Sequence, residues 1–306
     1  MKLYAMSSSS RLFIYGPVAL LALIIGLYGL YWKVSADMLS ARLDRANGGE
    51  IMPGVVFAFA GKSVGGFPFG LNIVLEGVTF AHEGPAGETA WRSEKIAIHA
   101  LFYGKGQYAL ETTGLQSFAQ PNEYGGPPRV LYITPHNAHA SAILNGGELT
   151  RFDLDLSQVE GKDASLGAPP DRTFTAGRAQ LHFEGNADQT ILVAARLEGA
   201  KIGQGYAAPL GRDLALATLR GKITQDATLQ DIRAGREGFN SAAERWRSAK
   251  GALDVDSLYI KSDTTDGETL AGAITLNAAR LLEGTLRSPA HPKGIVLGFR
   301  NGALLD

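Results

Sequence analysis

The spacing of apolar and polar residues along the chain changes once, close to Gly49. Before Gly49, residues 12–32 are apolar without interruption, which predicts a helix that is apolar on all sides. Beyond Gly49, apolar and polar residues alternate, and a period of two is the pattern of strands that bury one face. The sequence therefore predicts one long helix followed by a domain that is mainly β.

The uncharged run at residues 12–32 is long enough to cross a hydrocarbon core of about 30 Å, because a helix rises about 1.5 Å per residue. Aromatic side chains suited to a membrane interface stand at its end, at Tyr28, Tyr31 and Trp32. We expect a single-pass anchor after a short cytoplasmic tail, residues 1–11. The alternative is a signal peptide cleaved near Val34-Ser35-Ala36, although its h-region usually has only about 7–15 residues.

Residues 33–48 continue the helical pattern until Asn47-Gly48-Gly49 ends it, which predicts a helical stalk. The tail before the anchor is very short and the domain after it is long. We therefore expect the N-terminus inside and the C-terminal domain outside.

The strands fall into two β regions, residues 49–160 and 173–306, with a Pro- and Gly-containing loop between them. The two regions form either separate domains or one continuous domain. We expect curved antiparallel sheets, shaped as a half-barrel or a sandwich. One short helix is expected near residues 241–250, because Ser241 and Glu244 fit a capping box and Gly251 follows.

The stretch from Gly65 to Glu76 predicts the first strand of this domain. Alternate residues share a face of a strand, so five apolar side chains fall on one side: Phe67, Phe69, Leu71, Ile73 and Leu75. The apolar phase slips at Gly77, which predicts a bulge there. A similar pattern recurs at residues 195–202, either as an internal repeat or as a coincidence in a chain rich in Leu and Gly.

Composition narrows the possible functions. The formal charge is −1, which provides no electrostatic attraction for nucleic acid, and the absence of cysteine excludes disulfides and thiolate chemistry. Glycine occurs 38 times and charged residues make up 19%, which suits many short strands joined by turns.

Motifs that suggest catalysis lack their structural context. Residues 61–65 match G-x-S-x-G, but Pro68 follows where a nucleophile elbow needs a helix, and a P-loop would need glycine in place of Val56. His136 and His139 would point apart on a strand. We therefore predict no catalytic residues, no metal site and no cofactor, and we expect that the protein is not an enzyme.

The run Gly66-Phe67-Pro68-Phe69, with a strand at residues 71–80 behind it and the apolar helix before it, resembles the DUF2125 family. Residues 209–211 and 251–260 resemble the second half of that family. The resemblance implies a protein of the inner membrane whose β domain faces the periplasm, with no assigned activity. The architecture is also similar to AsmA-like envelope proteins, whose curved sheets are associated with lipid handling. Such chains tend to close with a Pro-rich apolar segment, so a chain ending at residue 306 suggests a shortened C-terminus.

A sheet with one apolar face must bury it against another layer, and one short helix cannot cover so many strands. The first hypothesis is therefore a lipid-binding protein with an apolar groove lined by Phe67, Phe69, Leu71, Ile73 and Leu75. In the alternative, these residues form an ordinary closed core. A further hypothesis is a scaffold or adaptor in an envelope complex. The expected partners are the bilayer, through residues 12–32, and a lipid or an envelope protein.

Overall fold

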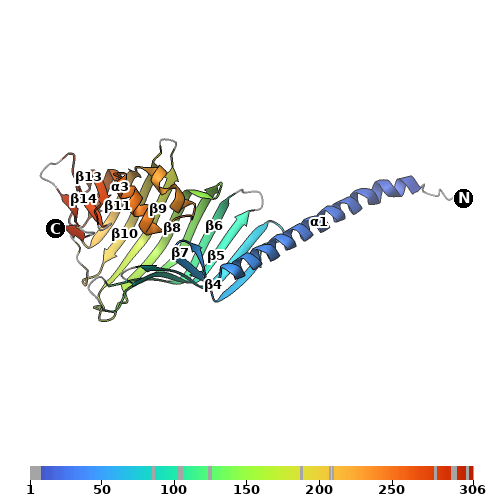
Figure 1. The fold of residues 1–306 in the computed structure, drawn as a ribbon, viewed down its shortest axis with the longest axis horizontal. Helices are drawn as coiled ribbons and strands as arrows, with labels where there is room; N and C mark the ends of the chain where they lie inside the picture. Colours follow the sequence, from blue (N-terminus) through green and yellow to red (C-terminus); the bar gives the residue numbers. More distant parts are fainter. Residues whose placement is uncertain are drawn as a thin grey trace.

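The computed structural model describes most of the chain. The described residues are 8–84, 87–101, 106–122, 126–186, 189–206, 208, 210–278, 281–290, 295–300 and 303–305. Residues 1–7 of the expected tail, Pro209 and Asp306 lie outside them. One long helix leads into one large sheet, and the strands follow one another along the long axis of the molecule (Figure 1).

Helix α1 (Ser8–Ala46) contains both the expected anchor and the expected stalk without a break. Apolar side chains from Leu20 to Leu30 are more than half exposed, except Tyr28, which is 36% exposed. It is a helix long and apolar enough to cross a membrane. Toward its C-terminal end, Leu39 and Leu43 pack against the sheet, so the last part of α1 belongs to the domain.

In the described part of the chain, the sheet has 16 strands in an antiparallel meander, in which β3 is a side branch that pairs with β4. The strands are β1 (Gly49–Met52), β2 (Val55–Ala58), β3 (Gly61–Gly65), β4 (Gly70–Gly84), β5 (Gly87–Leu101), β6 (Gln107–Gln120), β7 (Arg129–Asn145), β8 (Glu148–Asp163), β9 (Thr173–Gly185), β10 (Ile191–Ile202), β11 (Asp213–Ile223), β12 (Leu253–Ser262), β13 (Glu268–Leu276), β14 (Leu282–Arg287), β15 (Val296–Arg300) and β16 (Ala303–Leu305). The predicted mainly β, antiparallel architecture is confirmed. The sheet runs without interruption through β8 and β9, on either side of the expected boundary loop.

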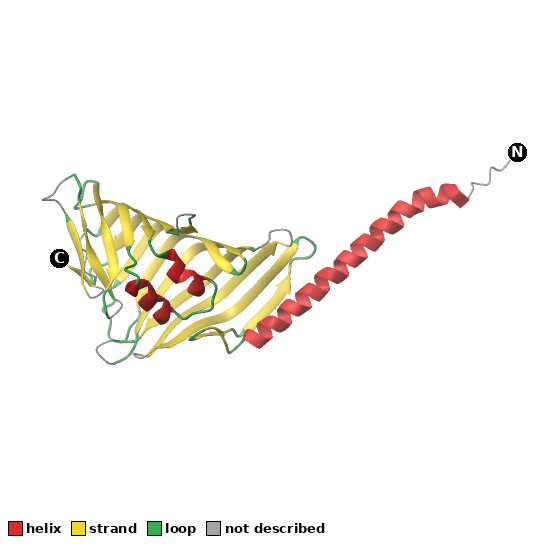
Figure 2. Ribbon diagram, turned by 45° about the horizontal axis from the view of Figure 1, so that its top comes forward, coloured by secondary structure: helices red, strands yellow, loops and turns green. Residues whose placement is uncertain are grey.

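The two faces of the sheet differ in polarity, as the alternating sequence predicts. We call the inner face the one that carries Leu75, Trp91, Leu154, Leu219 and Leu270. The pairing of neighbouring strands places these residues on the same side of the sheet. The opposite, outer face carries charged and polar residues of the same strands. The C-terminal end of α1 packs on the inner face, and the later helices lie over this face (Figure 2).

A line of phase slips crosses the sheet. On alternate strands β4, β6, β8 and β10, one residue has positive φ: Gly77 (61°), Gly114 (79°), Gln158 (48°) and Gly199 (57°). On β4 the slip keeps Leu75 and Val78 both buried, although they are three residues apart. The expected phase slip at Gly77 is therefore confirmed, but the pairing of β4 with β5 keeps its register across Gly77, so the slip is not the expected bulge. The resembling stretch at residues 195–202 places Gly199 on the same line.

Between β11 and β12 the chain forms η1 (Asp226–Leu229), α2 (Gln230–Arg233) and α3 (Phe239–Ser248). The predicted late helix is confirmed, but its expected cap is wrong. Helix α3 begins after Gly238, whose backbone is extended and which makes no side-chain capping bond. Ser241 consequently lies inside the first turn.

Candidate functional site

The structure divides the five predicted groove residues among different environments. Strand β4 begins at Gly70, so the expected strand starts too early: Phe67 and Phe69 belong to a turn. The chain reverses direction at Gly66, whose φ is 103°. This position requires glycine, because a Cβ there would meet backbone atoms 2.9 Å away. Phe67 is 52% exposed and Phe69 is 77% exposed.

The remaining three residues lie on the inner face of β4. Ile73 and Leu75 are 6% and 2% exposed and pack with neighbours that include Leu39 and Leu43 of α1. Leu71 is half-buried. The side chains of Ile73 and Leu75 therefore contact protein at the end of the sheet where α1 joins it.

Farther along the sheet, the inner face is less well covered. Tyr108 and Phe118 of β6 are each 37% exposed. Other apolar residues of the same face on β7, β8 and β9 are only half-buried, namely Leu131, Ile133, Phe152, Leu154, Leu181 and Phe183. We call the surface formed by these eight residues of β6–β9 the apolar trough.

The trough ends where the C-terminal strands close into a core. Leu270 of β13 is completely buried and Leu286 of β14 is 1% exposed, and both belong to one cluster that reaches back to Val159 of β8. The cluster has members on every strand from β8 to β15, all of them buried, which indicates that this part of the sheet curls toward its inner face. The trough is therefore flanked by α1 and by this core.

Two hollows indent the trough near the ends of its strands. One, of about 450 Å³, is lined by residues that include Phe118, Leu131 and Tyr206. The other, of about 360 Å³, includes Phe152, Phe183 and Arg233 in its lining. Each hollow combines apolar side chains with a few polar ones, which is the usual character of a binding site for an amphipathic molecule.

Aromatic rings extend from the trough toward the helix-covered end. Phe80 stacks on Trp91 with centroids 5.3 Å apart, and Trp91 stacks on Phe118 at 6.3 Å. The indole Nε1 of Trp91 donates a hydrogen bond to Oε1 of Gln116 at 3.1 Å. This bond satisfies a polar side chain that is only 5% exposed.

The segment from η1 to α3 bridges distant parts of the inner face (Figure 2). Arg233 pairs with Glu148 of β8 at 2.5 Å and with Asp226 at 2.8 Å. At the start of α3, Asn240 Nδ2 lies 3.4 Å from His82 Nε2 of β4. At its end, Trp246 donates a hydrogen bond to the carbonyl of residue 224 at 2.7 Å. Burial raises the pKa of Asp226, and the charge of Arg233 opposes that rise.

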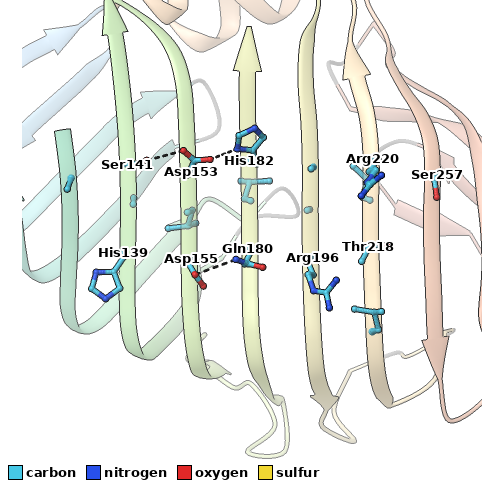
Figure 3. A pocket seen from close by; sticks show the side chains of 18 residues that line it. His139, Ser141, Asp153, Asp155, Gln180, His182, Arg196, Thr218, Arg220 and Ser257 are labelled. Atoms are coloured by element: carbon cyan, nitrogen blue, oxygen red, sulfur yellow. Dashed lines mark hydrogen bonds and ion pairs between the residues drawn. The ribbon is translucent and has the colours of Figure 1, made fainter. Parts of the chain in front are cut away.

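The outer face holds a separate polar hollow of about 900 Å³ (Figure 3). Burial alone would raise the pKa of Asp153, but hydrogen bonds from Arg151, His182 and Ser141 outweigh it and lower the pKa. A hydrogen bond from Arg178 lowers the pKa of Asp155. These carboxylates are therefore ionised and paired, which suits a solvated sheet face better than general acid or base chemistry.

Sequence reasoning missed this charge network because its partners come from different strands. Asp153 and Asp155 are two residues apart and therefore share one face of β8, but their contacts with His182 and Arg178 depend on the register of β8 and β9. His139 lies 3.5 Å from Glu111. In the described part of the chain, no group of three or more His, Asp or Glu residues is arranged to hold a metal ion.

The motif at residues 61–65 forms strand β3, with no helix after it, as the sequence predicts. Lys62 Nζ donates a hydrogen bond to the Ser40 carbonyl oxygen and pairs with Asp44, both at 2.6 Å. This lysine therefore fixes β3 to α1.

These features define a class: a chain with a long apolar N-terminal helix and one open antiparallel sheet, whose apolar face is partly uncovered. The chain belongs to the family described as "Uncharacterized protein conserved in bacteria (DUF2125)", whose model matches residues 32–291. The resemblance noted in the sequence is thus confirmed. No curated protein and no solved structure matches the chain.

Proposed function

We propose that this protein is a membrane-anchored, non-catalytic lipid-binding protein whose apolar trough accommodates an acyl chain. The observation that carries the proposal is the partly exposed apolar surface of β6–β9, placed between α1 and the closed C-terminal core. Each methylene buried there would contribute about 0.8 kcal/mol, so one acyl chain could gain several kcal/mol. Lining residues would include Phe118, Leu131, Phe152 and Leu154.

The proposal places α1 across the inner membrane and the sheet in the periplasm. Its support is the exposed apolar surface of α1, together with the location that the DUF2125 resemblance implies. In this arrangement the near end of the trough lies next to the bilayer. A lipid could then move between the membrane and the trough without crossing a long aqueous gap.

Lipid retention by the purified full chain tests the proposal. The protein is isolated in mild detergent, examined by native mass spectrometry, and extracted for lipid analysis. We expect bound phospholipid in the wild-type protein and a loss of it in Leu154→Glu, because the new carboxylate would lie in the trough. The matched control is Leu192→Glu, since Leu192 is 41% exposed on the outer face.

A wild-type chain that carries no lipid and ignores added phospholipid would refute the proposal. Equal lipid content in folded Leu154→Glu and Leu192→Glu would show that Leu154 does not line the lipid-binding surface. Circular dichroism establishes that both variants are folded.

An adaptor role is the second candidate, and the open sheet favours it. The strand order ends at β1 and β16, and such an edge strand can pair with a strand of a partner. In the same experiment, a stoichiometric envelope protein bound to lipid-free chain would support the adaptor.

A further inference from the structure

The turn at residues 67–69, which we call the aromatic turn, is hydrogen-bonded to the middle of α1. Trp32 Nε1 donates a hydrogen bond to the Gly70 carbonyl oxygen at 2.8 Å, and the Tyr28 hydroxyl donates one to the Pro68 carbonyl oxygen. The ring of Phe67 lies edge-on to Trp32, with centroids 5.5 Å apart. The turn therefore sits beside one helical turn of α1, at residues 28–32.

The position of this contact along α1 is informative. On the C-terminal side, Lys33 and Asp37 form an ion pair whose side chains are 70% and 66% exposed, so this level of the helix suits water. On the N-terminal side, Ile25 and Leu27 are 56% and 58% exposed, so that level suits lipid. The aromatic turn lies at the change between the two.

The aromatic turn is also firmly held. The hydrogen bond and ion pair of Lys62 fix β3 to α1 near residues 40–44, while Trp32 fixes the first residue of β4. Contacts on both sides prevent the turn from moving independently of the helix. Phe69 nevertheless remains 77% exposed, with no protein layer over most of its ring.

We propose that the aromatic turn inserts into the outer-leaflet interface of the bilayer that α1 spans, with Phe69 as the main inserted side chain. Aromatic rings favour this interface, and the turn is held at its level. The beginning of β4 would then rest directly on the membrane, so the sheet would have a fixed orientation on it. This proposal requires that α1 span a membrane, but it does not require the trough to bind lipid.

The absence of cysteine makes a site-specific test direct. Phe69→Cys is labelled with nitrobenzoxadiazole, and the full chain is reconstituted in nanodiscs of phosphatidylcholine and phosphatidylglycerol with or without doxyl-labelled phosphatidylcholine. The matched control is Leu166→Cys, because Leu166 is 83% exposed in the loop between β8 and β9. We expect the label at residue 69 to show blue-shifted emission. We also expect doxyl-labelled lipid to quench its fluorescence, and this quenching should be stronger with a shallow doxyl group than with a deep one.

Equal quenching at residues 69 and 166 would overturn the proposal. Disulfide crosslinking of unlabelled Phe69→Cys between chains, together with absent quenching, would also overturn it, because a second copy would then cover the turn. If Phe69→Cys fails to fold, Gly65→Cys keeps both phenylalanines and adds a side chain where no atom lies within 4 Å. Quenching at residue 65 above that at residue 166 would then be the required result.

Discussion

At the scale of single residues, burial separates apolar side chains that look alike in the sequence. Leu75 and Leu270 are almost completely buried, whereas Leu154, on the same inner face, is half-buried. The alternating pattern assigns all three to one face, but it carries no information about what covers that face. Coverage depends on α1 and on the curl of the C-terminal strands, which are long-range features.

Truncation of these leucines should measure the difference in coverage. We expect Leu270→Ala to lower the free energy of unfolding by about 2–5 kcal/mol, because it leaves a cavity in a closed core. Leu154→Ala should cost less, since water or a ligand already reaches that side chain. Urea unfolding of both variants in the same detergent makes the comparison, and equal losses would show that the trough is packed like the core.

At the scale of elements, the segment from η1 to α3 depends on one buried cation. The side chain of Arg233 is 17% exposed and faces two carboxylates, Glu148 and Asp226, that are 22% and 12% exposed. Neither α2 nor its ion pairs follows from the sequence pattern, because a four-residue helix has too few turns to show a period. Helix α3 was predictable because it is longer and ends before a glycine.

Removing this cation should loosen α2 and α3 from the sheet. We expect Arg233→Met to lower stability by about 3–5 kcal/mol, because it leaves two largely buried carboxylates without their cation. The control is Arg236→Met. The side chain of Arg236 is 59% exposed and pairs with Asp231, so the effect of its loss should stay within about 0–1 kcal/mol. The rate of amide hydrogen exchange at residues 239–248 should rise in Arg233→Met only. Unchanged exchange in both variants would show that Arg233 does not hold α3 on the sheet.

At the scale of the whole molecule, the sequence predicts which helices and strands are present better than it predicts how they pack. The long helix, the antiparallel strands and the late helix were predictable from their periods and from turn residues. The early start assigned to β4 was wrong because alternation continues through Phe67 and Phe69, although the chain turns there. The packing of α1 on Ile73 and Leu75, which decides what those side chains contact, involves residues far apart in the sequence.

Carboxylates whose pKa is lowered in the folded state should make the sheet sensitive to acid. A hydrogen bond from Ser165 lowers the pKa of Asp163, and the pKa values of Asp153 and Asp155 are lowered as well. A carboxyl group whose pKa is lower in the folded state than in the unfolded state stabilises the fold at any pH above its unfolded-state pKa. This contribution is lost as the pH falls through the folded-state pKa. Asp226 has the opposite sign, because burial raises its pKa and favours the protonated folded state in acid.

Hydrogen bonds from Arg236 and Arg245 also lower the pKa of Asp231. Four lowered groups against one raised group predict a net loss of stability in acid. The free energy of unfolding should therefore stay nearly constant from neutral pH to about 4 and fall below that. Asp155→Asn should reduce stability at neutral pH and flatten this fall, because it removes the ionised partner of Arg178. Asp266→Asn, which makes the same charge change in the turn between β12 and β13, should leave the profile unaltered. Urea unfolding followed by circular dichroism across the pH range measures both, and a profile for Asp155→Asn parallel to that of the wild type would show that this ion pair contributes nothing to the acid response.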